Sequence, residues 1–306
     1  KGNSIPMMLM SLLLVLSLER LITKTPNWHI EKYAAQYRAF LQDKGLIKFQ
    51  EGNEGEEGSK KASSTALYFF LLLPAVVLGA IEYWGLGAFL TFIEQSLILF
   101  ICIGCPALRA VYKSFLNAAD RGDLQACSMY TDQLGHCASQ SDSDGSAGTE
   151  GKTFGQHLTW LNYQHYAAVM LWFIAFGAPG ALFYSLSRST TEALCDANHP
   201  LKAAAGRLMF ALDYIPVRVT AFGMLMMGHF SRALPEWIKY ALQFDVPAYD
   251  VLTQISSKAE ILTPDEQQLQ AENAAIEPKV LVKLAKRNVI FLLVITSALT
   301  LVGSLA

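Results

Sequence analysis

The chain has 306 residues and a formal net charge of −2 at pH 7, so no overall basic field would attract nucleic acid. Hydrophobic residues make up 52% of it and charged residues only 16%, whereas soluble globular domains carry about 25% charged residues. The composition therefore indicates a membrane protein in which a few apolar segments alternate with long hydrophilic ones. The five cysteines contain no CxxC pair, so their spacing gives no disulfide framework and no zinc site.

The first half of the chain contains three apolar segments. A spanning helix needs about 20 mostly apolar residues. Residues 5–18 form the first segment, which could extend to residue 22. Because Glu19 and Arg20 stand where a signal peptide would have its small-residue cleavage site, we interpret it as an uncleaved span. Residues 66–83 and 87–105 are the second and third spans and form a tight antiparallel hairpin.

A fourth apolar segment, 166–187, is interrupted at residues 177–180 by the sequence Gly-Ala-Pro-Gly. Such a break frees backbone groups that lipid cannot satisfy, which predicts two half-helices in a kinked span or in a re-entrant hairpin. The final span is predicted at 288–305. No strand pattern is present, so we expect an all-α membrane protein with about four to six membrane segments, one of them broken or re-entrant.

The distribution of Lys and Arg predicts the orientation of these segments. The basic loop after the first span and the segment 106–165 are expected in the cytoplasm, and the turn at 84–86 outside. A simple span at 166–187 would place the basic stretch 188–287 outside. Either a re-entrant 166–187 or an additional membrane segment at 208–230 avoids this. The C-terminus is outside in both cases.

The hydrophilic segments are interpreted as parts of one membrane domain, 1–306. Segments 51–64 and 138–152 are rich in Gly, Ser and acidic residues and are predicted to be flexible loops. Segment 107–135 predicts a helical hairpin in which Asp123 caps the second helix. Segment 245–277 is expected to be polar and mobile, with a helix starting at residues 263–266.

Two motifs are interpreted in structural rather than chemical terms. Residues 146–153 almost spell a phosphate-binding loop, but Ser146 replaces the first Gly and no strand leads into the segment. A linker that ends in a helix start is favoured. His157 and His165 do not have the spacing of zinc ligands, so no metal site is predicted.

The segment 206–230 has the richest pattern of polar residues. On one helix at 100° per residue, Arg207, Arg218 and His229 lie within about 40° of one another, although Pro216 is expected to kink or start a helix there. Two further polar residues of this segment are Asp213 and Tyr214. Two interpretations remain open: an anion site gripped by the arginines, or snorkelling and salt bridges inside the bundle.

Several motifs resemble the AmpE/CobD family of membrane proteins. They are LTWLNYQHY at 158–166, LDYIPVR at 212–218, the residues from 228 to 237, and the opening at 12–21. This resemblance covers nearly the whole chain. It implies a multi-pass protein of the bacterial inner membrane that is linked to induction of a chromosomal β-lactamase, acts as a sensory transducer and has a suggested nucleotide-binding role.

The CobD branch of this family joins an aminopropanol phosphate to adenosylcobyric acid and uses ATP with Mg²⁺. Residues that match its pattern here include Asn162, Tyr184, Arg207, Tyr214 and Arg218. Acidic positions of that pattern are occupied by Leu161, His165 and Met209. Since Mg²⁺ needs carboxylates, the resemblance implies that the ATP-dependent reaction has been lost.

We therefore expect a regulatory or sensory protein that binds a small anionic ligand, such as a nucleotide with Mg²⁺, on the cytoplasmic side. The bilayer and a second copy of the chain are further expected partners. The predicted ligand-binding residues are Asn162, Tyr184, Arg207, Asp213, Tyr214, Arg218 and His229. One alternative is a CobD-like amide-forming enzyme with replacement metal ligands at Asp120, Asp123 or Asp213. The other is a structural membrane partner without a small ligand, and transport is a weaker fourth hypothesis.

Overall fold

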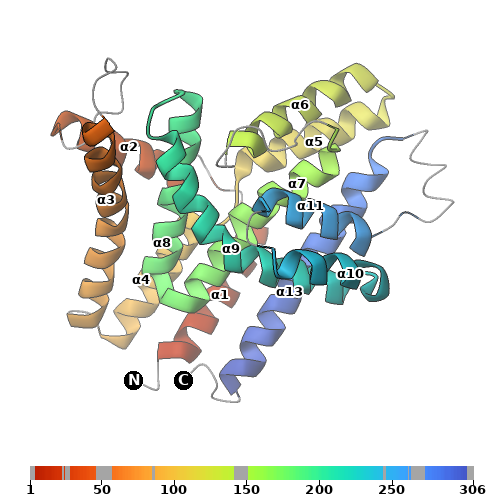
Figure 1. The fold of residues 1–306 in the computed structure, drawn as a ribbon. Coiled ribbons are helices and arrows are strands. Elements are labelled where there is room, and N and C mark those ends of the chain that lie inside the picture. Colours follow the sequence, from red (N-terminus) through yellow and green to blue (C-terminus); the bar gives the residue numbers. More distant parts are fainter. Residues whose placement is uncertain are drawn as a thin grey trace. The chain divides into compact units, whose positions relative to one another are not determined.

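Helices make up every regular element of the residues that the structure describes, which confirms the all-α prediction (Figure 1). The structure is a computed structural model, and it describes residues 4–22, 24, 28–45, 57–84, 87–140, 151–243, 246–260, 262 and 273–301. The helices are α1 (Ser4–Leu21), α2 (Ile30–Asp43), α3 (Glu57–Trp84), α4 (Ala88–Cys102), α5 (Pro106–Asp120), α6 (Leu124–Gln140), α7 (Phe154–Asn162), η2 (Tyr163–Ala167), α8 (Ala168–Asp196), α9 (Lys202–Met227), α10 (Phe230–Ala241), α11 (Ala248–Ala259) and α13 (Ile276–Leu301).

The chain divides into two compact units. Unit 1 consists of Lys1–Gly104, Val169–Leu212 and Thr296–Ala306, and unit 2 consists of Cys105–Ala168 and Asp213–Ile295. Each unit is therefore built from segments that are distant in sequence. A single membrane domain for the whole chain stays a prediction.

Within the described part of the chain, three helical segments are long and apolar enough to cross a membrane. They are Ser64–Trp84, Phe154–Asp196 and Lys202–Met227, and a fourth span is possible if α4 and α5 count as one broken span. The predicted span at 66–83 is thus confirmed as a helix of sufficient length and hydropathy, and α9 fits the alternative in which 208–230 is an additional membrane segment. The apolar part of α1, Met7–Glu19, is shorter than these. Among the described residues α13 is not in this set, and residues 302–305 of the predicted last span lie outside them.

In unit 1 the helix α4 turns back from the end of α3, as the predicted hairpin requires, and Gln95 of α4 donates to Glu82 of α3 at 3.3 Å (Figure 1). Helix α1 packs along α4. The end of α4 returns to the link between α1 and α2. Lys24 Nζ donates hydrogen bonds to the carbonyls of Phe100 and Ile103, the latter at 2.5 Å. The His29 ring bonds the carbonyl of Gly104 at 2.9 Å. A positive charge at the carbonyl end of a helix is favourable, so these contacts hold the end of α4 against the link between α1 and α2.

Pro74 lies inside α3 and cannot donate a hydrogen bond to the carbonyl of Phe70 one turn earlier. The Tyr37 hydroxyl of α2 donates to that carbonyl at 2.7 Å. A neighbouring side chain thus satisfies the backbone group that the proline frees, as spanning helices require.

Pro216 shows the same arrangement in α9, which runs through it from Lys202 to Met227 instead of starting there. The carbonyl that Pro216 leaves without an amide belongs to Leu212. The indole nitrogen of Trp172 donates to this carbonyl at 3.3 Å. Of the two alternatives expected at Pro216, a kink or a helix start, the helix start is therefore wrong.

The α8 segment folds back sharply at Gly177, so the predicted break in 166–187 is confirmed. Gly177 has φ 69° and ψ −157°, which are not helical values. A Cβ on Gly180 would collide with the Trp172 carbonyl and would lie 2.7 Å from the Cβ of Phe176. Eight residues of straight helix would separate residues 172 and 180 by about 12 Å. The contacts therefore favour the hairpin over a single bent span.

In unit 2 the predicted hairpin at 107–135 is confirmed as α5 and α6, which lie side by side (Figure 1). The turn uses Gly122 at φ +70°, a conformation that favours glycine. Asp123 accepts a hydrogen bond from the backbone N–H of Ala126 at 2.9 Å. This is the N-terminal cap that the sequence predicted.

Two predicted loops are partly helical. α3 begins at Glu57 and therefore includes the second half of segment 51–64, and α6 continues to Gln140. Segment 245–277 contains the buried helix α11, so the expectation of a mobile segment is wrong there. The helix start predicted at 263–266 lies outside the described residues, as do residues 51–56 and 141–150.

Candidate functional site

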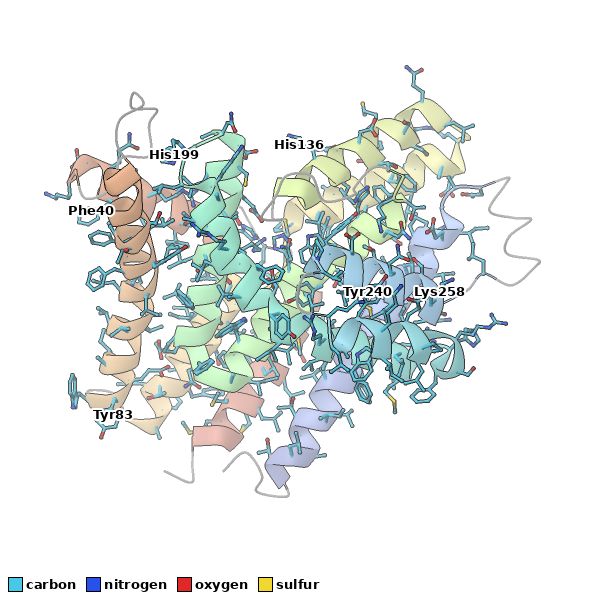
Figure 2. The ribbon with its side chains drawn as sticks, in the orientation of Figure 1. Phe40, Tyr83, His136, His199, Tyr240 and Lys258 are labelled. Carbon is cyan, nitrogen blue, oxygen red and sulfur yellow. The ribbon has the colours of Figure 1, made fainter. Side chains whose placement is uncertain are left out.

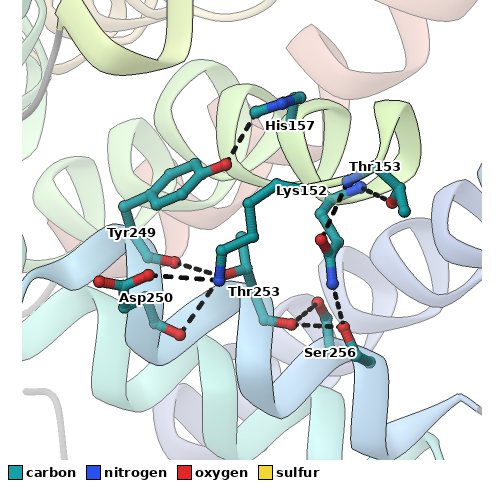
Figure 3. Close-up of polar contacts among 9 residues, drawn as sticks. Lys152, Thr153, His157, Tyr249, Asp250, Thr253 and Ser256 are labelled. Atoms are coloured by element: carbon teal, nitrogen blue, oxygen red, sulfur yellow. Dashed lines mark hydrogen bonds and ion pairs between the residues drawn. The ribbon is translucent and has the colours of Figure 1, made fainter. Parts of the chain in front are cut away.

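The start of α7 is held by a capping box. The Thr153 hydroxyl accepts a hydrogen bond from the backbone N–H of Gln156, and the Gln156 side-chain oxygen accepts one from the backbone N–H of Thr153. Lys152, just before it, forms an ion pair with Asp250 at 3.3 Å and donates to Thr253 (Figure 3). The helix-start interpretation of this motif is therefore confirmed, and Lys152 is engaged with α11.

Further polar contacts join α7 to α11 and α13 within unit 2. The buried His157 contacts the Tyr249 hydroxyl through Nδ1 at 2.7 Å (Figure 3). The Thr153 hydroxyl donates to Glu277 at 2.7 Å. Burial raises the pKa of the Glu277 carboxyl, and the Thr153 hydroxyl opposes this shift. These contacts explain why the polar helix α11 is buried.

The predicted residues Asn162 and Asp213 lie near a short π-helix, η2, that follows α7. Tyr163, its first residue, donates to the carboxylate of Asp213 at 2.7 Å, and both side chains are buried. Asn162 is half-buried at the end of α7. π-Helical turns are frequent at functional sites, and the second residue of this one is Gln164.

Gln164 was missed by the sequence reasoning. Its side chain is completely buried, and neither its amide nitrogen nor its amide oxygen has a hydrogen-bond partner among the described residues. Nearly all buried polar groups in proteins are hydrogen-bonded, so such a group requires an explanation. The available sequence signal was a glutamine between Asn162 and His165 in a mostly apolar stretch.

Arg218 holds the end of α10. Its guanidinium donates to the carbonyls of Tyr214 at 2.8 Å, Ala241 at 3.4 Å and Gln243 at 2.5 Å. It also stacks on the Tyr214 ring, 3.6 Å from the centroid. Since a guanidinium has five N–H groups, these three bonds fix its orientation and leave two N–H groups beyond them.

The remaining predicted residues are not part of this arrangement. α9 ends at Met227 and His229 is the N-cap of α10, so the expected helical stripe that included His229 is wrong. The His229 N–H instead bonds the carbonyl of Ala259 at 2.6 Å. Arg207 and Tyr184 belong to unit 1, where Arg207 is exposed and Tyr184 is buried.

The aspartates proposed as replacement metal ligands have other partners. Asp123 caps α6, Asp120 lies 4.0 Å from Lys279, and Asp213 accepts from Tyr163. Among the residues that the structure describes, none of the three belongs to a group of His, Cys, Asp and Glu side chains close enough to share an ion.

Unit 1 contains a second polar centre, which the sequence reasoning assigned to the end of a span. The stretch 185–191 (SLSRSTT) is buried throughout, and the Arg188 side chain is completely inaccessible. Arg188 pairs with Glu31 at 3.1 Å and with Glu192 at 3.3 Å. The detectable signal was a run of polar residues directly after an apolar segment.

This architecture defines an all-helical protein with three, or up to four, segments suited to membrane crossing, and with buried polar centres between its helices. A family model described as "Regulatory signalling modulator protein AmpE" matches residues 7–306. The chain belongs to this family, which confirms the resemblance seen in the sequence.

Two kinds of relatives are similar to this chain. Protein AmpE of Shigella flexneri is 26% identical over 230 residues, 70% of this chain and 75% of the relative. The cobalamin biosynthesis protein CobD of Chromobacterium violaceum is 26% identical over 232 residues, 73% and 70% of the two chains. CobD of Stutzerimonas stutzeri is 34% identical over 83 residues, 26% and 27%. No solved structure matches this chain.

Proposed function

We propose that this chain is a regulatory protein of the bacterial inner membrane that acts in β-lactamase induction and senses a small anionic ligand from the cytoplasmic side. The family description, a regulatory signalling modulator, and the likeness to protein AmpE of Shigella flexneri support the regulatory role. The apolar helices support a membrane location. The ligand site belongs in unit 2, around η2 and the second half of α9.

The buried amide of Gln164 carries this proposal. A buried polar group without a partner costs about 1–3 kcal/mol, and a bound ligand that offers both an acceptor and a donor would remove this cost. Asn162 and Tyr163 directly precede Gln164 in the chain, and Asp213 is hydrogen-bonded to Tyr163. They add donors and acceptors to the same part of unit 2.

Arg218 supports the negative charge of the ligand. Its guanidinium is held in place by three carbonyls and by the Tyr214 ring, so little conformational entropy would be lost when its remaining N–H groups bind an oxyanion. Charge-assisted hydrogen bonds of this kind are about twice as strong as neutral ones. A phosphate or carboxylate fits this chemistry.

Nucleotide binding to the detergent-purified chain, with and without Mg²⁺, tests the proposal. Gln164→Leu keeps the side-chain volume and removes the unpartnered amide, so we expect nucleotide binding to fall at least tenfold while the melting temperature stays equal or rises. Arg218→Lys keeps a positive charge and should weaken binding less than Arg218→Ala. The proposal fails if wild type does not bind nucleotide, or if Gln164→Leu binds as wild type does.

The relationship to CobD favours a second candidate function, an ATP-dependent amide-forming enzyme. The Chromobacterium violaceum relative covers 73% of this chain and is described as a cobalamin biosynthesis protein. An assay for amide formation on a cobalamin intermediate with Mg²⁺ and ATP decides this point. Product formed by wild type and lost in Asp213→Asn would establish the enzyme and displace the purely regulatory function.

A further inference from the structure

Arg188 is a buried cation inside unit 1, distant in sequence from the proposed ligand residues of unit 2. Its side chain is fully inaccessible, and the neighbouring residues of the stretch 185–191 are buried as well. Removing a guanidinium from water costs several kcal/mol unless it is paired and hydrogen-bonded. An ionisable residue inside a membrane protein therefore indicates a functional site unless its partners explain it.

Glu31 on α2 occupies the position of an anionic ligand beside Arg188. One carboxylate oxygen, Oε1, accepts from Arg188 Nη2 at 3.1 Å, and the other, Oε2, accepts from the Ser189 hydroxyl at 2.6 Å. Arg38 donates to the same hydroxyl at 3.0 Å and adds a second guanidinium. Two donors on the two oxygens of one carboxylate are the arrangement with which proteins bind free carboxylates.

The charges around Glu31 favour an anion. Arg188, Arg38 and the buried Lys24 are positive, and Glu31 and Glu192 are the acidic partners of Arg188. His29 lies within electrostatic range of Glu31, Arg188 and Lys24, so these groups belong to one cluster, and burial lowers the pKa of His29. Two guanidinium groups, Arg188 and Arg38, therefore act on the Glu31 carboxylate, while Asp196 adds a third acidic group near Glu192.

Ser187 is a further buried polar residue of the stretch 185–191. It directly precedes Arg188, it is completely buried, and its hydroxyl has no hydrogen-bond partner among the described residues. A polar group in this state is completed by a bound molecule or by water. The stretch 185–191 thus contains a buried hydroxyl that the ion pairs of Arg188 do not satisfy.

We propose that Arg188, Ser189 and Arg38 form a binding site for a small carboxylate, in which Glu31 is the exchangeable internal occupant. The Glu31 side chain is 40% exposed whereas Arg188 is inaccessible. A free carboxylate therefore reaches Arg188 by taking the place of Glu31. Its occupancy releases the first turn of α2 from α8.

Rescue of a Glu31→Ala variant by succinate tests this site in the full-length purified protein. We expect Glu31→Ala to lower the melting temperature and succinate to restore it, with an affinity at least tenfold higher than for wild type, because the internal competitor is gone. Ser189→Ala should weaken succinate binding in the Glu31→Ala background while leaving a folded protein. A folded Glu31→Ala variant that ignores succinate overturns the proposal.

Two controls make the test specific. Glu236→Ala removes a carboxylate that pairs with Lys239 at 3.8 Å on α10, and its stability should not respond to succinate. Inorganic phosphate should rescue Glu31→Ala at least tenfold less well than succinate, and equal rescue would overturn the carboxylate assignment. Gln164→Leu should leave succinate binding unchanged, so this site and the nucleotide site can fail separately.

Discussion

Tyr37 and Trp172 show how single residues complete helices that contain proline. The Tyr37 hydroxyl donates to the carbonyl of Phe70, and the Trp172 indole N–H donates to the carbonyl of Leu212. In each case a proline leaves that carbonyl without a backbone amide partner. Pro is normally costly inside a helix because the bond one turn back is lost. Here that cost is reduced by a side chain from another helix of unit 1, which also fixes where α2 and the α8 hairpin pack.

A double-mutant cycle tests this at Tyr37. Tyr37→Phe should lower the free energy of unfolding by about 1–3 kcal/mol because a buried carbonyl loses its donor. In a Pro74→Ala background the helix supplies its own amide, so the same change should cost clearly less. Tyr33→Phe, at an exposed site of α2, serves as the control and should cost little. Equal losses from Tyr37→Phe in both backgrounds would contradict the argument.

Glu277 gives a pH dependence of stability. Burial raises the pKa of its carboxyl in the folded chain, so folding favours the protonated form. This contribution is fully present below the unfolded pKa and is lost as the pH rises through the folded pKa. Glu277→Gln keeps an oxygen for the Thr153 hydroxyl and should raise the melting temperature by about 1–3 °C at pH 8. The two proteins should melt alike near pH 4, and a difference confined to low pH would refute the assignment.

Individual site residues were predictable only where local sequence determines their surroundings. Asp123 caps α6 as expected, because the cap involves an amide three residues later. Arg218 was recognised as a special cation, but its carbonyl partners come from the end of α10. Gln164 owes its importance to burial without a partner, and Arg188 to burial and to ion pairs that only the tertiary fold brings, so neither stood out in the sequence.

At the scale of elements, apolar runs predicted the spans and the break at Gly177, but polar segments were less informative. Only half of the residues of α11 are apolar, and its buried face also includes the polar groups of Tyr249, Thr253 and Ser256. Their hydrogen-bonding groups are satisfied by other helical residues, for example His157 and the carbonyl of Thr253. The burial of these polar groups is therefore explained by their partners rather than by hydropathy.

The fold-back of α8 depends on Gly180. A Cβ there would collide with the carbonyl of Trp172, a backbone atom that cannot move without opening the hairpin. Gly180→Ala should therefore destabilise the chain by about 3 kcal/mol or more. In Gly79→Ala the new methyl would meet Pro179 at an ordinary 3.5 Å, so this matched change should be neutral or stabilising by up to about 1 kcal/mol. Chemical denaturation in detergent would measure both, and equal stability of the two variants would exclude the sharp reversal.

At the scale of the whole molecule, the contacts within unit 1 bear on membrane topology. The α3–α4 hairpin brings the chain back to His29, and the α8 hairpin brings Arg188 to Glu31. Phe40 and His199 lie at one end of unit 1, and Tyr83 lies at the opposite end (Figure 2). Tyr83 and Trp84 are strongly exposed there, as expected for rings at a membrane interface. These contacts therefore favour a re-entrant path for the segment 166–187, with the end of α8 on the same side as α2.

Cysteine labelling tests this topology with three exposed positions of unit 1, in a background from which the native cysteines have been removed. Gln42→Cys and Ala197→Cys should react with a membrane-impermeant maleimide from the same side, because the α8 hairpin brings residue 197 back to the end of unit 1 that contains α2. Ala88→Cys, at the start of α4, should react only from the other side. The positive-inside rule further expects the shared side to be cytoplasmic, so residues 42 and 197 should be labelled in inverted vesicles and protected in intact spheroplasts. If residue 197 were labelled together with residue 88, α8 would cross the membrane, and the contact between Arg188 and Glu31 would not form in the bilayer.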